Sequence, residues 1–477
     1  LGSMTANEDL LADSRGPDNG TQVSASPGRL RRSVRFRHLI GNGLVFIGPA
    51  APVSIYGVLD ARSDGAVAAV YVVATIIMGL TAVSYAQMSG AVPKAGSVFS
   101  YATAGIGPST GFMAGWMVLL DYMLIPSVAF LFTGLAMHSF LPSVPAWIFT
   151  GVAIVVATTL NLTGVKNLAR AAIVVVVIEA LTLGAVLVGA LVVITTTGAA
   201  RPVLSPLTGV GGFSTTAVIG AVSVATLAYL GFDAIATFAE ETTGASKLVG
   251  RAMLACLALV GVLFVAQSYV IQLLTPISPG ELAAHPELQG SLYYDVVRQQ
   301  VDPWLSTALG MAKALGACFS GMVGLAAGGR VVMTMARERR LPRAMSSVTA
   351  RTGIPTKAIA AITVVTLVLA VWAARIPTGL DLLSSAVSIG ALSAFLLLHA
   401  SVVGYFIVRR RSRRYLVHLI VPILAVASLI PVLALADRAA QLVGGTWLIV
   451  GLIIVAIQRK KRTTSSGAAV TTREMPD

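Results

Sequence analysis

The sequence predicts an all-α polytopic membrane protein with twelve transmembrane helices, and three observations support this prediction. Hydrophobic residues make up 56% of the chain and charged residues 11%, and the mean hydropathy is +0.84, which leaves too little polar surface for a water-soluble globule. Twelve apolar runs are long enough to cross a bilayer at about 20 residues per helix. The basic residues behind the net charge of +14 form short clusters between these runs, so we expect a lipid bilayer and no nucleic acid as partner.

The predicted spans cover residues 39–59, 66–89, 111–138, 144–162, 171–197, 215–241, 251–275, 305–335, 358–374, 381–408, 415–436 and 444–458. Basic residues concentrate before the first span and in alternate loops after it, up to the cluster Arg409 to Arg414 and the C-terminal group Arg459 to Arg462. The longest of the other loops, 276–304, is acidic. Because cytoplasmic loops are enriched in Lys and Arg, we expect a multi-pass protein of the cell membrane with both termini in the cytoplasm.

This pattern divides the chain into four parts. Residues 1–34 are rich in Gly, Ser and Asp and lack apolar periodicity, so a disordered cytoplasmic tail is expected there. Residues 35–414 form the predicted transport core of spans one to ten, and 415–458 contain spans eleven and twelve. Residues 459–477 are the expected cytoplasmic C-terminal tail.

Two spans are interrupted near their middle. The first contains Gly-Pro-Ala-Ala-Pro at residues 48–52, where each proline removes a backbone donor and disrupts a helical turn. The sixth contains Leu-Gly-Phe-Asp at residues 230–233. Such breaks are also compatible with harmless kinks, but breaks five spans apart are what two inverted repeats of five helices require, with the substrate site between the discontinuous helices. Their pairing with a midplane acid favours a substrate site.

Several acids are predicted to lie inside the bilayer. At about 1.5 Å per residue, Asp121, Glu179 and Asp233 all fall near the midplane, where a charge is costly and usually functional. Asp233 either binds an amine or holds the unwound backbone in place. Asp121 either takes part in proton coupling or tethers a neighbouring helix. Glu240 and Glu241, at the inner end of the sixth span, are predicted to form an inner gate beside cytoplasmic arginines.

Four groups of motifs carry a family resemblance. They are residues 82–86 (AVSYA) with 93–97 (PKAGS), 111–116 (GFMAGW) with 120–122 (LDY), 231–234 (GFDA) with 240–241 (EE), and 335–338 (MARE) with 341–342 (LP). With these motifs the chain, from about Arg35 to Arg414, resembles the amino acid, polyamine and organocation transporter superfamily. The resemblance implies a LeuT-type fold, with two inverted five-helix repeats plus two C-terminal helices, and alternating access to a substrate between helices one, three, six and eight.

Within that framework the residues expected to contact substrate are Ile47, Gly48, Pro49, Ala50, Ala51, Tyr122, Tyr229, Gly231, Phe232, Asp233 and Ser320. In amino-acid-carrying relatives, glycine-rich backbone in helix one receives the substrate carboxylate. Here Pro49 and Pro52 offer no amide hydrogen. The chain is in this respect similar to the putrescine-importer branch, so the working hypothesis is a secondary importer of putrescine or another polyamine.

Other functions remain open from sequence. A permease for cationic or neutral amino acids is the alternative within the superfamily, and a channel-like facilitator is the alternative from another class. An enzyme is not expected, because no nucleophile with its base and no HExxH metal motif is present. No GxxxxGK loop indicates an ATP-driven pump, and no cofactor or metal site is predicted.

The coupling ion is predicted to be a proton. Glu179 aligns with a helix-five lysine that stands in for sodium in several proton-coupled relatives, so it is a candidate proton carrier, or alternatively a glutamate hydrogen-bonded permanently within the bundle. Sodium is less favoured because Ser320 is flanked by Cys318 and Phe319, a poor oxygen set. Lys313, in span eight, has no assigned role. If it lies in the pocket, it weakens the case for a cationic substrate.

Overall fold

The protein is described from a computed structural model. The described residues are 34–163, 168–243, 247–349, 352–376 and 379–471; nearly all of the predicted N-terminal tail lies outside them. Within these ranges the regular secondary structure is helical, and the extended pairing consists of an isolated bridge between Val34 and Thr242. The all-α prediction is therefore confirmed.

Twelve helical segments correspond in order to the predicted spans. Among the described residues, 11 helices are long and apolar enough to cross a membrane, and a pair bent by 55° supplies the twelfth. The spans are α1 (Phe36–Ile47) with η1 (Ala51–Ser54) and α2 (Tyr56–Arg62), α3 (Val67–Ala91), α5 (Pro108–Phe140), α6 (Ala146–Thr163), α7 (Leu168–Thr197), α9 (Thr215–Tyr229) with η2 (Asp233–Glu241), α10 (Lys247–Leu274), α13 (Pro303–Arg337), α14 (Thr356–Ala373), α15 (Gly379–Val402) with η6 (Val403–Arg409), η7 (Leu416–Ile420) with α16 (Val421–Ala434), and α17 (Arg438–Thr471).

Short helices fill the loops between the spans. They are α4 (Val98–Gly105), α8 (Ser205–Thr208), α11 (Pro279–Ala284), η3 (Pro286–Leu288), α12 (Leu292–Val296), η4 (Val297–Val301) and η5 (Arg343–Ser346). The acidic 276–304 loop is therefore folded into a series of short helices. It leads into α13, where the Asp302 side chain accepts a hydrogen bond from Trp304 N and Pro303 occupies the first helical turn, a strong helix-start combination.

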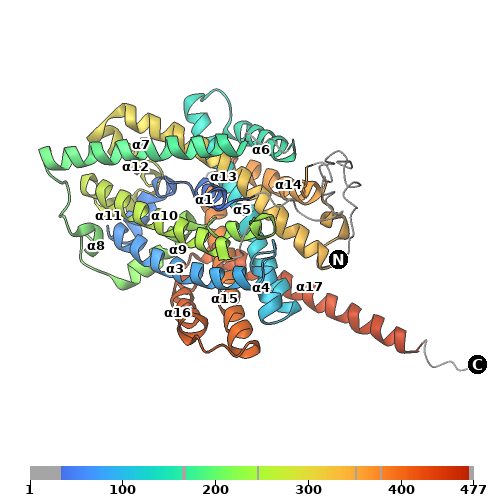
Figure 1. Ribbon diagram of the computed structural model, residues 1–477. Helices are drawn as coiled ribbons and strands as arrows, with labels where there is room; N and C mark the ends of the chain where they lie inside the picture. Colours follow the sequence, from blue (N-terminus) through green and yellow to red (C-terminus); the bar gives the residue numbers. More distant parts are fainter. Residues whose placement is uncertain (1–33, 164–167, 244–246, 350–351, 377–378, 472–477) are drawn as a thin grey trace, which may run out of the picture.

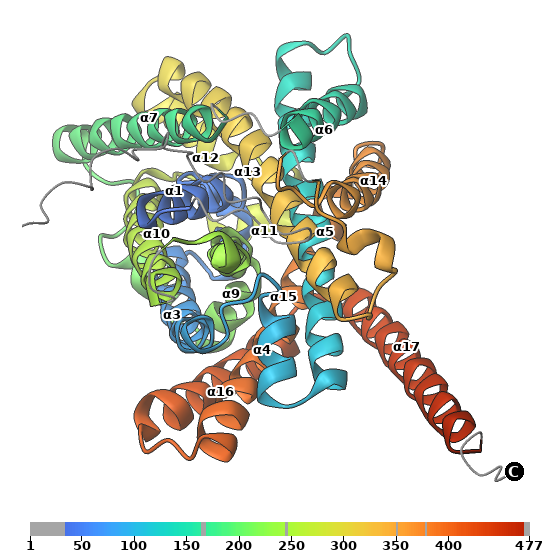
Figure 2. The ribbon, with the colours of Figure 1, turned by 45° about the vertical axis from the view of Figure 1, so that its right-hand side comes forward.

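Spans that are five apart in the sequence pack against each other. The contacting pairs are α1 with η2, α3 with α10, α5 with α13, and α6 with α14. Figure 2 shows α1, α3, α9 and α10 gathered in one bundle. This pairing is the arrangement that two five-helix repeats require, and it brings the first break beside the sixth-span break.

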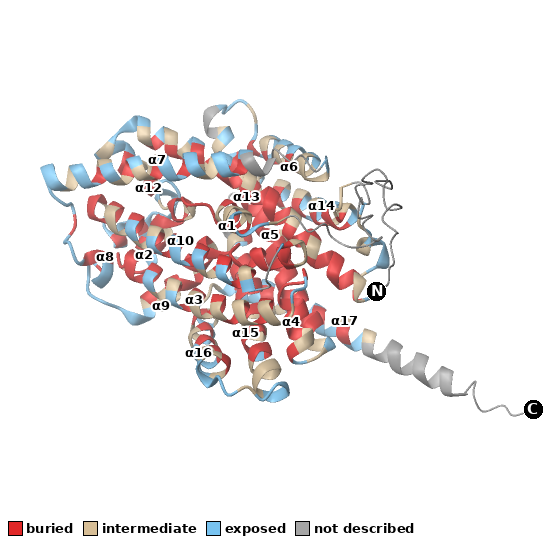
Figure 3. Cartoon of the chain, viewed as in Figure 1, coloured by how far each residue is buried: buried red, intermediate tan, exposed pale blue. Residues whose placement is uncertain are grey.

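Burial separates a central group of helices from a lipid-facing ring. Figure 3 shows α5 mainly buried, whereas α7 and α16 expose much of their surface. The exposed residues are apolar, for example Leu181 at 68% and Val262 at 73%. An apolar exterior suits a hydrocarbon environment, while the polar groups needed for function are left to the centre.

The last span attaches to the core through a pair of tryptophans. Trp116 Nε1 donates to the Trp447 carbonyl at 2.8 Å, and Trp447 Nε1 donates to the Trp116 carbonyl at 2.7 Å. Their rings stack at 4.3 Å. Helix α17 then continues to Thr471 and projects from the bundle at the lower right of Figure 1, so the predicted C-terminal tail begins as helix.

Candidate functional site

The break in the first span begins at Gly48. Its φ of +76° lies in the left-handed region that favours glycine, and Pro49 follows with no amide hydrogen. The Gly48 amide donates to Leu44 and the Ala51 amide donates back to Gly48. The amide of Ala50 turns toward α7 and donates to Glu179 Oε1 at 3.1 Å. Every amide from Gly48 to Ala51 thus has an acceptor within the protein.

Glu179 fits against the break because two neighbours are glycines. A Cβ at Gly48 would lie 3.6 Å from Glu179 Oε1, and a Cβ at Gly316 would lie 2.7 Å from Oε2. Glu179 is 1% exposed, yet its Oε2 atom has no hydrogen-bond partner among the described residues. One carboxylate oxygen therefore caps the break, and the other is available to a further donor.

Two side chains hold carbonyl groups next to the break. Gln267 Nε2 donates to the Pro49 carbonyl at 3.1 Å, and the Ser320 hydroxyl donates to the Phe46 carbonyl. The Phe46 carbonyl, which a sodium ion near Ser320 would need as a ligand, thus already accepts a hydrogen bond. Gln267 was missed from sequence, although a buried amide in the middle of an apolar span is a signal that could have identified it.

The second break surrounds Gly231, whose φ is +118°. A Cβ here would lie 2.9 Å from the Phe46 ring, so glycine also permits the two breaks to touch. Asp233 Oδ1 accepts from the Gly231 amide at 3.2 Å, and Oδ2 accepts from the Tyr122 hydroxyl at 2.8 Å. Of the two roles considered for Asp233, these contacts match that of holding the unwound backbone.

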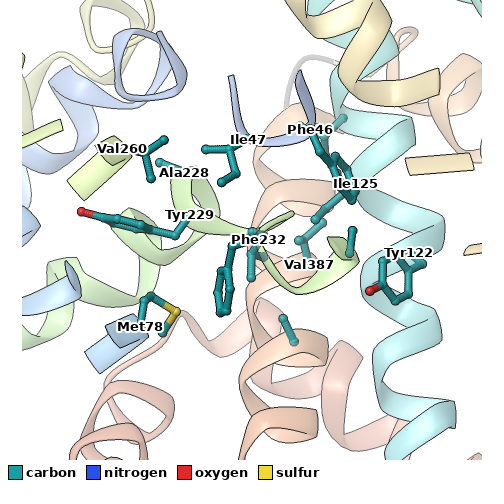
Figure 4. Close-up of a cluster of buried hydrophobic side chains, with 14 of the residues drawn as sticks. Phe46, Ile47, Met78, Tyr122, Ile125, Ala228, Tyr229, Phe232, Val260 and Val387 are labelled. Atoms are coloured by element: carbon teal, nitrogen blue, oxygen red, sulfur yellow. The ribbon is translucent and has the colours of Figure 1, made fainter. Parts of the chain in front are cut away.

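The aromatic residues predicted for the site pack in the core. Figure 4 shows Tyr122 on α5 facing the chain of the second break, with Phe232 and Tyr229 directed elsewhere. Phe232 lies 5.9 Å from Tyr85 between ring centroids. The Tyr229 hydroxyl is 2.6 Å from that of Thr75. The rings of Phe232 and Tyr229 thus form part of the packing around the second break.

Asp121 is a second buried acid beside this cluster. It is fully buried on α5, and neither carboxylate oxygen has a hydrogen-bond partner among the described residues. No ion pair in the described part of the chain involves Asp121 or Asp233. Burying an unpaired ionised carboxylate is among the costliest arrangements in a protein, so this position is suited to a carboxyl that carries a proton.

A cavity of about 70 Å³ lies between the first break, α5, α7, α9 and α13. Of the predicted site residues, Ile47, Gly48, Ala51, Glu179 and Ser320 line it, together with Lys313, Gly316 and Ser54. The structure places Pro49, Ala50, Tyr122, Tyr229, Gly231, Phe232, Asp121 and Asp233 outside it. The three midplane acids therefore do not share one pocket. At about 30 Å³ per water molecule, the cavity has room for a few water-sized groups.

The two ends of the cavity differ. Toward the 276–304 loop, hereafter the loop end, Ser54 and Phe132 separate it from two larger cavities of about 510 and 590 Å³. At the opposite end, hereafter the arginine end, four ionised side chains pair, Arg330 with Glu241 and Arg337 with Glu240. The Arg330 guanidinium also lies 4.1 Å from the centre of the Phe238 ring. Larger cavities thus lie close to the central one at the loop end, whereas ion pairs lie at the arginine end.

Two broken helices at pseudo-equivalent positions around a small central cavity are an arrangement found in membrane transporters. The sequence profile of the amino acid permease family matches residues 39–457, and the chain belongs to this family. Its function is therefore transport rather than enzymatic conversion.

Individual relatives differ in what their names say they carry. The chain is 26% identical over 446 residues to the low-affinity putrescine importer PlaP of Escherichia coli, covering 90% of this chain and 94% of the relative. It is 29% identical over 420 residues to the branched-chain amino acid permease BcaP of Lactococcus lactis, covering 80% and 85%. It is 28% identical over 404 residues to the vacuolar cationic amino acid transporter 2 of Arabidopsis thaliana, covering 78% and 60%.

Proposed function

We propose that the protein imports a small amine-bearing molecule and that Glu179 Oε2 receives the amine. The supporting observation is that protein carboxylates already occupy the amides that turn away from both breaks: Glu179 accepts from Ala50 N, and Asp233 accepts from Gly231 N. A substrate carboxylate would find no unused backbone donor among the described residues from Gly48 to Ala51. A substrate ammonium, in contrast, finds a buried acceptor without a partner, and charge-assisted hydrogen bonds of this kind are strong.

Putrescine or a related polyamine is the substrate we propose first. It carries amines and no carboxylate, and a putrescine importer is among the relatives. A second candidate is an amino acid. Lys313 lines the cavity and can receive a carboxylate, and amino acid permeases are also among the relatives.

The two ends of the cavity support a mechanism of alternating access. We place the arginine end, with both termini, in the cytoplasm, since cytoplasmic segments are enriched in Lys and Arg. Glu240 and Glu241 then act as the inner gate through their arginine partners, and substrate enters from the loop end past Ser54 and Phe132. Opening the inner gate requires separation of both ion pairs.

Proton coupling is the energy source we propose, and Asp121 and Glu179 are the candidate carriers. Asp121 is buried with no hydrogen-bond partner among the described residues, while Glu179 retains one. The two are distinguished by uptake into proteoliposomes with and without a pH gradient. If Asp121 carries the proton, Asp121→Asn loses gradient-driven accumulation but retains substrate exchange. Because Glu179→Gln is also expected to lose amine binding, loss of accumulation in this variant is not diagnostic, whereas retained proton-driven accumulation excludes Glu179 as the carrier.

The substrate proposal is tested by thermal-shift measurements on the purified protein across amines and amino acids, because a ligand that binds only the folded state stabilises it. Putrescine is expected to raise the melting temperature, and Glu179→Gln is expected to abolish the effect. The matched control is Glu281→Gln, at an exposed acid in the 276–304 loop. Stabilisation by amino acids but not by amines would overturn the polyamine proposal. Accumulation of substrate above its external concentration distinguishes a transporter from a channel-like facilitator.

A further inference from the structure

Lys313 is the only basic side chain among the described residues that line the central cavity. It extends from α13 and is half-buried. Its Nζ atom lies 4.0 Å from the position that a Gly48 Cβ would take, and the Glu179 carboxylate oxygens lie 3.6 and 3.9 Å from the same point. The ammonium and the carboxylate therefore meet at the first break, on either side of one glycine.

The ammonium has no fixed partner in the described part of the chain. Among the described residues no hydrogen bond or ion pair involves Lys313, and Glu179 Oε2 is likewise without a hydrogen bond. If Lys313 were only a permanent counter-ion, its ammonium would be expected to pair directly with Glu179, because unpaired buried charges are costly. The Lys313 ammonium and Glu179 Oε2 thus lie near each other without a hydrogen bond between them.

Lys313 also faces a second space. It lines the 510 Å³ cavity at the loop end as well as the central one, and the outer cavity contains the carboxylate of Asp295. A lysine has a flexible four-carbon stem with a compact charge at its tip. Its ammonium can therefore turn inward to Glu179 or outward to the larger cavity, which Arg298 also lines.

We propose that Lys313 is a specificity-determining residue that acts as a tethered competitor for Glu179. The inference rests on the proposed function, since it assumes that a substrate amine binds Glu179 Oε2. Before the amine arrives, the Lys313 ammonium counters the Glu179 charge. As the amine enters from the loop end, Lys313 withdraws into the outer cavity, because two ammonium groups cannot share so small a space at low cost.

This arrangement has a consequence for affinity. Part of the attraction between Glu179 and a substrate amine is spent on displacing Lys313, so affinity is lower than a lone buried carboxylate would provide. Removing the lysine charge should strengthen amine binding. If Lys313 instead received a carboxylate or another acceptor on the substrate, its removal would weaken binding, so the two roles predict changes of opposite sign.

The test is isothermal titration of the purified full-length protein with putrescine as the probe. Lys313→Met and Lys313→Gln are expected to lower the Kd about tenfold or more, and Lys313→Arg, which keeps the charge, should stay near the wild-type value. In a Glu179→Gln background, Lys313→Met should have little effect because the shared carboxylate is gone. Lys357→Met, at an exposed lysine at the start of α14, is the control.

The outcomes separate the two proposals. An unchanged or raised Kd in folded Lys313→Met and Lys313→Gln proteins, checked by thermal unfolding, would overturn the competitor role. Full putrescine binding by Glu179→Gln would overturn the proposed function itself. Loss of binding in Glu179→Gln without tightening in the lysine variants rejects only the role of Lys313.

Discussion

The hydroxyl of Tyr122 donates a hydrogen bond to Asp233 Oδ2 at 2.8 Å and so ties the third span to the break in the sixth. Both residues are fully buried. The other oxygen of Asp233 caps the Gly231 amide, so one carboxylate fixes the break to itself and to α5. Any movement of the sixth-span break during transport must carry α5 with it or exchange this hydrogen bond.

Removing that hydroxyl should destabilise the protein. In Tyr122→Phe, Asp233 Oδ2 loses its donor while remaining buried, which typically costs about 1–3 kcal/mol. We expect a lower melting temperature in detergent and slower transport. Tyr415→Phe is the control, because this tyrosine is 55% exposed and should change neither quantity. A melting temperature equal to that of the wild type would show that the hydrogen bond contributes nothing.

A buried ion pair should make a larger contribution at the loop end. Arg201 donates to Asp60 through two nitrogens, at 2.7 and 2.8 Å, and also to the Ile277 carbonyl. Asp60→Ala leaves Arg201 buried and unpaired, and this loss is expected to lower the free energy of unfolding by about 3–5 kcal/mol.

A second ion pair on the same α2 helix supplies the control for Asp60→Ala. Arg62 and Asp437 are 38% and 39% exposed, and exposed pairs contribute about 0–1 kcal/mol. Thermal unfolding of Asp60→Ala and Arg62→Gln should therefore differ clearly. Equal destabilisation would contradict the assignment of the Arg201 pair as the stronger one.

The fit between α13 and Glu179 predicts that Gly316 cannot carry a side chain without cost to the site. In Gly316→Ala the new methyl would lie 2.7 Å from Glu179 Oε2, so the carboxylate has to move away from the first break. Putrescine binding is expected to weaken about tenfold or more, since each 1.4 kcal/mol is a factor of ten.

Gly184→Ala is the matched control for that substitution. It lies on α7 five residues after Glu179, and no atom lies within 4 Å of its added Cβ. Alanine there should leave binding unchanged and favour the helix slightly. Similar binding by both variants would argue against a site built around the Glu179 carboxylate.

The pairing at the arginine end predicts a charge-reversal rescue. The Arg330 and Glu241 side chains are only 12% and 14% exposed, so Arg330→Gln or Glu241→Gln should each lower stability by about 1–3 kcal/mol. The double variant Arg330→Glu with Glu241→Arg should recover part of the loss. Lys94→Gln tests the more exposed pair with Glu338 and should have a smaller effect. Failure of the double variant to recover any stability would indicate that the pair does not act as a unit.

Much of this architecture was predictable from sequence. The twelve spans follow from apolar length, which the bilayer thickness imposes. Both breaks follow from local chemistry, because Pro49 lacks a donor and Gly48 and Gly231 tolerate backbone that other residues resist. The presence of three acids within apolar spans was also evident, since a carboxylate in such a run is conspicuous in any arrangement.

The tertiary structure alone decided which of those three acids lines the central cavity. Counting along a helix gives depth, and by depth Asp121, Glu179 and Asp233 are equivalent. Which of them faces the cavity depends on helix rotation, crossing angles and the path of the broken segments, and these are set by contacts between residues far apart in the chain. The structure places Asp233 and Asp121 in a separate buried cluster and brings Glu179 and Lys313, from different helices, together beside Gly48.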